Sequence, residues 1–136
     1  MSNQCQKLNQ FQPYFLAFLR IVAGYTFLLH GTSKFFFFPK AMGDTAPALF
    51  SLFGIGGILE IVLGAFIVLG LFTRISAFIL SGQSAVIYFM FHAEAANVLY
   101  PLMNGGESAV LFCFIFLYLV FAGAGAFALD NKLCRK

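Results

Sequence analysis

Charged residues are scarce in this chain, and tryptophan is absent. Only 10% of the 136 residues are Asp, Glu, Lys or Arg, whereas about 25% is usual in a soluble domain. Hydrophobic residues make up 61%, including 20 Phe, and the mean hydropathy is +0.91. Water is therefore not the solvent for most of the folded surface. We expect an integral membrane protein with a single domain, residues 1–136, and the lipid bilayer as its main partner.

Several motifs that would indicate an enzyme or a nucleic-acid-binding protein are missing. Cys5, Cys113 and Cys134 show neither CxxC nor zinc-ligand spacing. The chain has no glycine-rich dinucleotide motif, no P-loop and no HExxH. The net charge of +3 is small and dispersed, so we expect no nucleic-acid partner. We predict no metal site and do not expect catalysis by the isolated chain.

Four apolar segments are each long enough to cross a membrane as a helix. They comprise residues 13–33, 50–72, 75–92 and 108–127, each close to the roughly 20 residues that a spanning helix needs. Their hydrophobicity is continuous rather than alternating, which favours helices over the strands of a closed barrel. The sequence predicts an all-α membrane protein, a four-transmembrane-helix bundle with tails 1–12 and 128–136.

The basic residues predict the orientation of this bundle. With both tails in the cytoplasm, Lys7, Arg74, Lys132, Arg135 and Lys136 lie inside and only two basic residues, Lys34 and Lys40, lie outside. Cytoplasmic loops carry the excess of Lys and Arg in membrane proteins. The sequence therefore predicts cytoplasmic N- and C-termini.

Two opposite charges lie inside the predicted spans. Glu60 is near the middle of segment 50–72, and Arg20 lies within segment 13–33. A charge at mid-membrane costs roughly 2.5–3.5 kcal/mol on insertion scales, so each needs a partner or a role. At 100° per residue both fall on glycine-bearing helix faces, which favours close helix approach. We predict that Arg20 pairs with Glu60. The predicted helix-packing glycines are Gly24, Gly31, Gly56, Gly57 and Gly64.

Further polar residues share the predicted interior of the bundle. Ser84, Tyr88 and His92 recur every four residues along segment 75–92. His30, Lys34 and Glu107 lie at the outer ends of two other predicted spans. The predicted intramembrane cluster, for binding or for structure, is Arg20, His30, Lys34, Glu60, Ser84, Tyr88, His92 and Glu107.

The residues themselves leave the role of this cluster open. Arg20 and Glu60 could form an ion pair that only fixes helix register. They could instead build a proton, quinone or small-anion site, because ionisable groups inside membranes are often functional, or they could contact a partner subunit. His30 and His92 fit an interfacial position, with metal or haem ligation as the alternative, although no third ligand has suggestive spacing.

Four segments together resemble the DoxX family of small bacterial inner-membrane proteins, in particular its YphA-like members. The segments are LRIVAGYTFLLHGTSKF (Leu19–Phe35), GILEIVLGAFIVLGLFTR (Gly57–Arg74), NGGES (Asn104–Ser108) and GAGAFALD (Gly123–Asp130). They occur in the family's order and extend over nearly the whole chain. The matching positions include Arg20, Gly24, His30, Gly31, Lys34, Glu60, Gly64, Gly70, Thr73, Arg74, Glu107, Gly123 and Asp130. The run Phe35–Phe38 departs from the family pattern.

The resemblance implies a four-helix bundle in the bacterial inner membrane. Some relatives are subunits of membrane oxidoreductase assemblies tied to quinones, sulfur compounds or oxidative stress. This favours a small subunit of a redox assembly that binds a quinone or relays protons, with Arg20 and Glu60 balancing charge. His30, Lys34 and Glu107 would then form the outer mouth of the site. The alternatives are a non-enzymatic scaffold or assembly factor, and transport of a small solute by a homo-oligomer.

Overall fold

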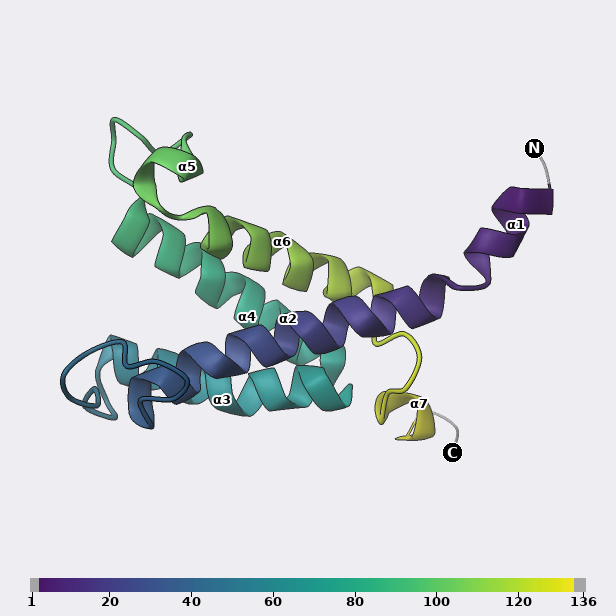
Figure 1. The fold of residues 1–136 in the computed structure, drawn as a ribbon, viewed down its shortest axis with the longest axis horizontal. Coiled ribbons are helices and arrows are strands. Elements are labelled where there is room, and N and C mark those ends of the chain that lie inside the picture. Colours follow the sequence, from purple (N-terminus) through teal and green to yellow (C-terminus); the bar gives the residue numbers. More distant parts are fainter. Residues whose placement is uncertain (1–2, 134–136) are drawn as a thin grey trace.

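A computed structural model describes residues 3–133, and its regular elements are all helical (Figure 1). The elements are α1 (Asn3–Asn9), α2 (Gln12–Phe35), α3 (Leu52–Leu69), α4 (Thr73–Ile87), the π-helical turn η1 (Tyr88–His92), α5 (Pro101–Asn104), α6 (Glu107–Ala122) and α7 (Asp130–Leu133). The predicted all-α class is confirmed. Three helices are long and apolar enough to cross a membrane: α2, α3, and α4 together with η1. The fourth apolar helix, α6, is shorter, with 16 residues.

The observed helices are shorter than two of the predicted spans. Segment 50–72 contains α3, which ends at Leu69 because Gly70 adopts the left-handed conformation, with φ of 68°. Segment 108–127 contains α6, which ends at Ala122 before Gly123 with φ of 83°. Glycine takes positive φ without steric cost, so each glycine ends its helix several residues before the apolar run stops.

Side chains also fix where helices begin. The Ser51 hydroxyl accepts a 3.0 Å hydrogen bond from the Gly54 amide and caps the first turn of α3. The carboxylate of Asp130, the first residue of α7, accepts from the Phe72 and Thr73 amides at 2.7 and 2.9 Å. These are free amides at the start of α4. The cap of α4 therefore comes from a residue near the other end of the chain.

The long helices form two pairs, α2 beside α3 and α4 beside α6. Glycines let the first pair approach closely: a Cβ on Gly24 would lie 2.7 Å from Cγ2 of Ile67. The core between the pairs consists of Ala23, Phe27, Ile67, Ala77, Leu80, Phe116 and Leu119.

The two pairs separate toward one end of the bundle. They meet near the short connection between α3 and α4, and they diverge toward the end that carries α5 and the α2–α3 connection (Figure 1). Helices α1 and α7 lie at the opposite end. The space between the diverging pairs holds the candidate site.

Candidate functional site: a cavity between the helix pairs

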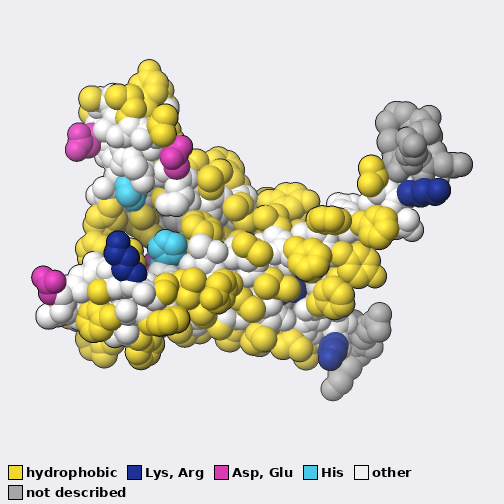
Figure 2. Space-filling view, viewed as in Figure 1, with side chains coloured by type: hydrophobic (Ala, Val, Ile, Leu, Met, Phe, Trp, Pro, Cys, Tyr) yellow, Lys and Arg dark blue, Asp and Glu magenta, His cyan; other side chains and the backbone are white. Residues whose placement is uncertain are grey.

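A cavity of about 620 Å³ lies between the two helix pairs at their open end. Its wall is mostly apolar, with side chains from α2, α3, α4, η1 and α6. Ile55 of α3 and Val86 of α4 line it and are still 48% and 45% exposed, so parts of its wall also reach the exterior of the bundle. Small-molecule sites are typically concave, mostly apolar, and about 300–1,000 Å³ in volume. Figure 2 shows Lys or Arg and His side chains gathered around the hollow at this end.

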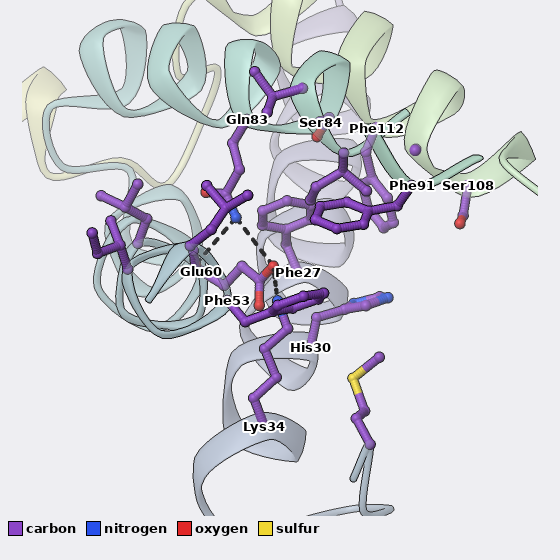
Figure 3. Close-up of a pocket in the computed structure, with 18 of the residues that line it drawn as sticks. Phe27, His30, Lys34, Phe53, Glu60, Gln83, Ser84, Phe91, Ser108 and Phe112 are labelled. Atoms are coloured by element: carbon purple, nitrogen blue, oxygen red, sulfur yellow. Dashed lines mark hydrogen bonds and ion pairs between the residues drawn. The ribbon is translucent and has the colours of Figure 1, made fainter. Parts of the chain in front are cut away.

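A charged pair with an amide beside it forms the polar part of the wall (Figure 3). Lys34 donates from Nζ to Oε1 of Glu60 at 2.7 Å. Gln83 donates from Nε2 to the same oxygen at 3.1 Å, and to the Gly56 carbonyl at 3.1 Å. Because that carbonyl can only accept, it fixes which end of the Gln83 amide carries the nitrogen. Three helices, α2, α3 and α4, meet at this one carboxylate.

Two oxygen atoms of this cluster have no hydrogen-bond partner. Oε2 of Glu60 and Oε1 of Gln83 are both buried, and the described residues 3–133 supply no donor for either. Glu60 as a whole is 2% exposed. A buried acceptor without a partner costs about 1–3 kcal/mol, and more when it is charged. Both atoms belong to side chains that line the cavity.

Both histidines of the chain line the cavity, and each ring is held by a hydrogen bond from Nδ1 to a backbone carbonyl. Nδ1 of His30 lies 2.9 Å from the Thr26 carbonyl, and Nδ1 of His92 lies 3.2 Å from the Asn104 carbonyl. A carbonyl accepts only, so Nδ1 is the donor in both rings. In the neutral ring Nε2 is then the acceptor. Among residues 3–133, no group of three or more His, Cys, Asp and Glu could hold a metal ion.

The predicted pairing of Arg20 with Glu60 is wrong. Arg20 is fully buried, and its guanidinium donates to five backbone carbonyls at 2.6–3.2 Å. The acceptors are Ile67, Val68, Ala124, Ala126 and Phe127. These carbonyls belong to the C-terminal end of α3 and to the chain after α6, where helical partners run out. Arg20 therefore joins α2, α3 and the C-terminal segment away from the cavity.

The predicted polar cluster is thus divided in two. His30, Lys34, Glu60, Ser84 and His92 line the cavity. Arg20, Tyr88 and Glu107 do not. The Tyr88 hydroxyl donates to the Val98 carbonyl at 2.7 Å and accepts from Asn104 at 3.0 Å, so it secures the connection before α6. Glu107 is exposed at the first turn of α6.

The predicted glycines lie mainly between α2 and α3. A Cβ on Gly31 would lie 2.7 Å from the Gly57 carbonyl, and one on Gly64 would lie 3.1 Å from Cβ of Leu28. Gly57 meets the Phe35 ring in the same way. Gly56 differs, because its nearest neighbour is the Gln83 amide of α4 at 3.3 Å.

Gln83 is the main site residue that the sequence analysis missed. The helical wheel puts it on a different face from Ser84, Tyr88 and His92. A signal was nevertheless present in the short connection between α3 and α4. Residues equally far from a tight helical turn lie at similar depth in the two helices. Glu60 and Gln83 are related in this way about the Leu71–Phe72 bond.

The three membrane-length helices and the apolar exterior define a multi-pass integral membrane protein. The DoxX family model matches residues 15–93, more than half of the chain. The chain belongs to the DoxX family. An uncharacterized protein of Haemophilus influenzae is 50% identical over 131 residues, which cover 95% of this chain and 98% of that protein. No solved structure matches the chain.

Proposed function

We propose that this protein is a small membrane subunit of a redox assembly and that its cavity holds the ring of a lipid-soluble quinone. The observation that supports this is an apolar cavity of about 620 Å³ with one polar cluster, Lys34, Glu60 and Gln83, in its wall. Ligand sites commonly combine an apolar lining with a few placed polar groups that fix orientation. An uncharged ring with oxygen substituents matches that combination.

The geometry also gives a lipid-soluble molecule a route into the cavity. Ile55 of α3 and Val86 of α4 line the cavity and are about half exposed on the exterior of the bundle. In a bilayer this face of the bundle meets acyl chains, so an apolar ligand could enter from the membrane without crossing water. Lys34 retains N–H groups beyond the one that it gives to Glu60. Those groups can donate to a ring oxygen.

We also propose four spans, with α6 as the fourth, and both tails in the cytoplasm. The basis is the distribution of Lys and Arg, five on the side of the tails and two on the other. The cavity then lies near the periplasmic side, because α1 and α7 are at the opposite end of the bundle. A reporter fused after residue 136 tests this. Green fluorescence from a fused fluorescent protein is expected, and alkaline phosphatase activity at the same position would contradict it.

Native mass spectrometry of the protein extracted from its own membrane with minimal detergent tests the redox function. A retained quinone, or a co-purifying dehydrogenase or sulfurtransferase subunit, is the expected result. Leu59→Trp, which enlarges a side chain in the cavity wall, should lower the retained quinone several-fold. Ile58→Trp is the matched control, because Ile58 is the preceding residue of α3, is 41% exposed and does not line the cavity. A protein that carries phospholipid alone would contradict the proposal.

The alternative is a scaffold or assembly factor whose polar residues only hold the helices together. The five carbonyl contacts of Arg20 favour it for that residue. Replacement of Lys34 and Glu60 together by apolar residues separates the two functions. If the protein is a scaffold, the double variant should still bind its partner, and the assembly should keep its activity. If it is a quinone-binding subunit, the double variant should still bind its partner but lose the bound quinone.

A further inference from the structure

Among the polar groups of the cavity wall, free hydrogen-bond acceptors outnumber free hydrogen-bond donors. Glu60 Oε2 and Gln83 Oε1 are buried acceptors without a partner among the described residues. His30 and His92 each use Nδ1 as donor to a backbone carbonyl. Their Nε2 atoms are therefore acceptors in the neutral rings. All four side chains belong to the cavity wall.

Few donors face the same space. Ser84 gives its hydroxyl proton to the Leu80 carbonyl at 2.9 Å. The Gln83 amide nitrogen is directed to Gly56 and Glu60. Lys34 keeps further N–H groups after its bond to Glu60, and the Ser108 hydroxyl also lies in the wall. A ligand that only accepts hydrogen bonds would satisfy Lys34 and leave the buried acceptors unpaired.

We infer that the cavity takes a ligand that donates hydrogen bonds through ring hydroxyls, and that of a quinone couple it binds the reduced hydroquinone in preference to the quinone. This inference rests on the proposed function. A hydroquinone hydroxyl both donates and accepts, so it can satisfy Glu60 Oε2 or Gln83 Oε1 and still accept from Lys34. A quinone carbonyl can only accept. Each hydrogen bond that the hydroquinone makes to one of these acceptors, and that the quinone cannot make, strengthens binding of the hydroquinone relative to the quinone.

The geometry of the carboxylate supports this direction of donation. Lys34 of α2 and Gln83 of α4 both donate to Oε1 of Glu60 on α3. Neither of them donates to Oε2. Figure 3 shows the carboxylate among the labelled aromatic side chains Phe27 and Phe53, which offer no hydrogen-bond donor. A bond from a ligand hydroxyl to a carboxylate is charge-assisted and is stronger than one between neutral groups.

The test measures binding of three molecules with the same ring substituents and decyl chain to the full-length protein in lipid nanodiscs under anaerobic conditions. Decylubiquinol has two hydroxyl donors, decylubiquinone has none, and the di-O-methyl ether of decylubiquinol keeps the aromatic ring without donors. Retention is measured at equilibrium and corrected with empty nanodiscs. The quinol should bind at least about tenfold tighter than the quinone, as one or two additional hydrogen bonds imply. The midpoint potential of the bound couple then rises by about 30 mV. The ether should bind no tighter than the quinone.

Variants identify the atoms responsible. Gln83→Leu removes one unpaired acceptor and should reduce the quinol preference about threefold or more. Ser81→Ala is the matched control on α4: Ser81 donates to the Cys113 carbonyl and lies outside the cavity, so the preference should not change. If Gln83→Leu does not fold, Glu60→Gln serves instead, because its amide replaces an acceptor with a donor at nearly the same shape.

The outcomes separate this inference from the proposed function. Equal affinities, or tighter binding of the quinone, overturn the inference and leave quinone binding in place. No retention of any of the three molecules above empty nanodiscs overturns both. An unchanged preference in a folded Gln83→Leu or Glu60→Gln protein overturns the assignment of the acceptors.

Discussion

Lys34, in the last turn of α2, donates a hydrogen bond of 2.7 Å from Nζ to Oε1 of Glu60 on α3. The Lys34 side chain is 14% exposed and that of Glu60 2%, so water screens this pair weakly. Arg20, the other basic residue of α2, lies 14 residues earlier, or about 21 Å along the helix axis. The charge that neutralises Glu60 therefore comes from the end of the span rather than from within it.

A double-mutant cycle should detect this pairing. Glu60→Gln and Lys34→Met each remove one partner from a buried pair, and each should lower the free energy of unfolding. The double variant should lose less than the sum, with a coupling energy of about 1–3 kcal/mol. SDS-induced unfolding followed by circular dichroism provides the measurement. The cycle of Glu60→Gln with Arg20→Met is the control and should be additive within about 0.5 kcal/mol. The reverse ranking of the two couplings would contradict the structure.

Arg20→Met should be among the most destabilising substitutions in the chain. It removes donors from five buried or partly buried carbonyls on two segments, and a hydrogen bond from a charged group contributes about 1.5–3 kcal/mol. We expect a loss of more than about 3 kcal/mol. Arg20→Lys should not restore stability, because an ammonium has three N–H donors and a different geometry. Lys40→Met, which removes an exposed cation, is the control and should unfold like the unmodified protein. Similar unfolding of Arg20→Met would show that the carbonyl contacts contribute little.

Gly31→Ala should separate α2 from α3. A Cβ at this position would lie 2.7 Å from the Gly57 carbonyl and 2.6 Å from Cγ1 of Ile61, so the backbone and a partly buried side chain must move to relieve these contacts. We expect a loss of about 1–3 kcal/mol. Gly82→Ala is the control on α4, because nothing lies within 4 Å of its Cβ position. It should be neutral or slightly stabilising, since alanine favours helix by about 1 kcal/mol over glycine. Equal effects of the two substitutions would contradict the close approach.

Asp130→Ala should weaken the start of α4. The Asp130 carboxylate accepts from the Phe72 and Thr73 amides, and loss of such a cap costs about 1–2 kcal/mol. Hydrogen exchange at the first turn of α4 should increase while exchange in α3 stays unchanged. Lys132→Ala, two residues along in α7 and exposed, should leave both unaltered. An increase confined to α7 itself would show that the cap does not hold α4.

The presence of the helices and the positions of the apolar and polar segments could be predicted from the sequence, because both depend on local properties. Continuous apolar runs of about 20 residues permit little other than membrane-crossing helices. The ends of those helices could not be predicted in the same way. Gly70 and Gly123 end α3 and α6 within apolar segments, and hydropathy alone does not register that.

Which polar residue meets which could not be predicted from the sequence. A helical wheel gives the face of each residue but not the depth at which two helices cross, so Arg20 and Lys34 were equally placed to meet Glu60. Gln83 was missed for the same reason, since its face depends on how α4 packs against α3. The sequence also did not predict the π-helical turn at the end of α4, in which Phe91 and His92 line the cavity.

The sequence by itself determined that this chain is a helical membrane protein, because a composition so poor in charge cannot be solvated as a soluble domain. It also determined which ionisable groups need partners. Only the tertiary structure decided that Arg20 binds backbone carbonyls where α3 and α6 end, whereas Glu60 binds Lys34 and Gln83 beside a cavity. The physical reason is that a buried charge is stabilised by whichever dipoles or counter-charges packing brings within about 3 Å. Packing in turn depends on the register and divergence of the two helix pairs, which are properties of the whole bundle.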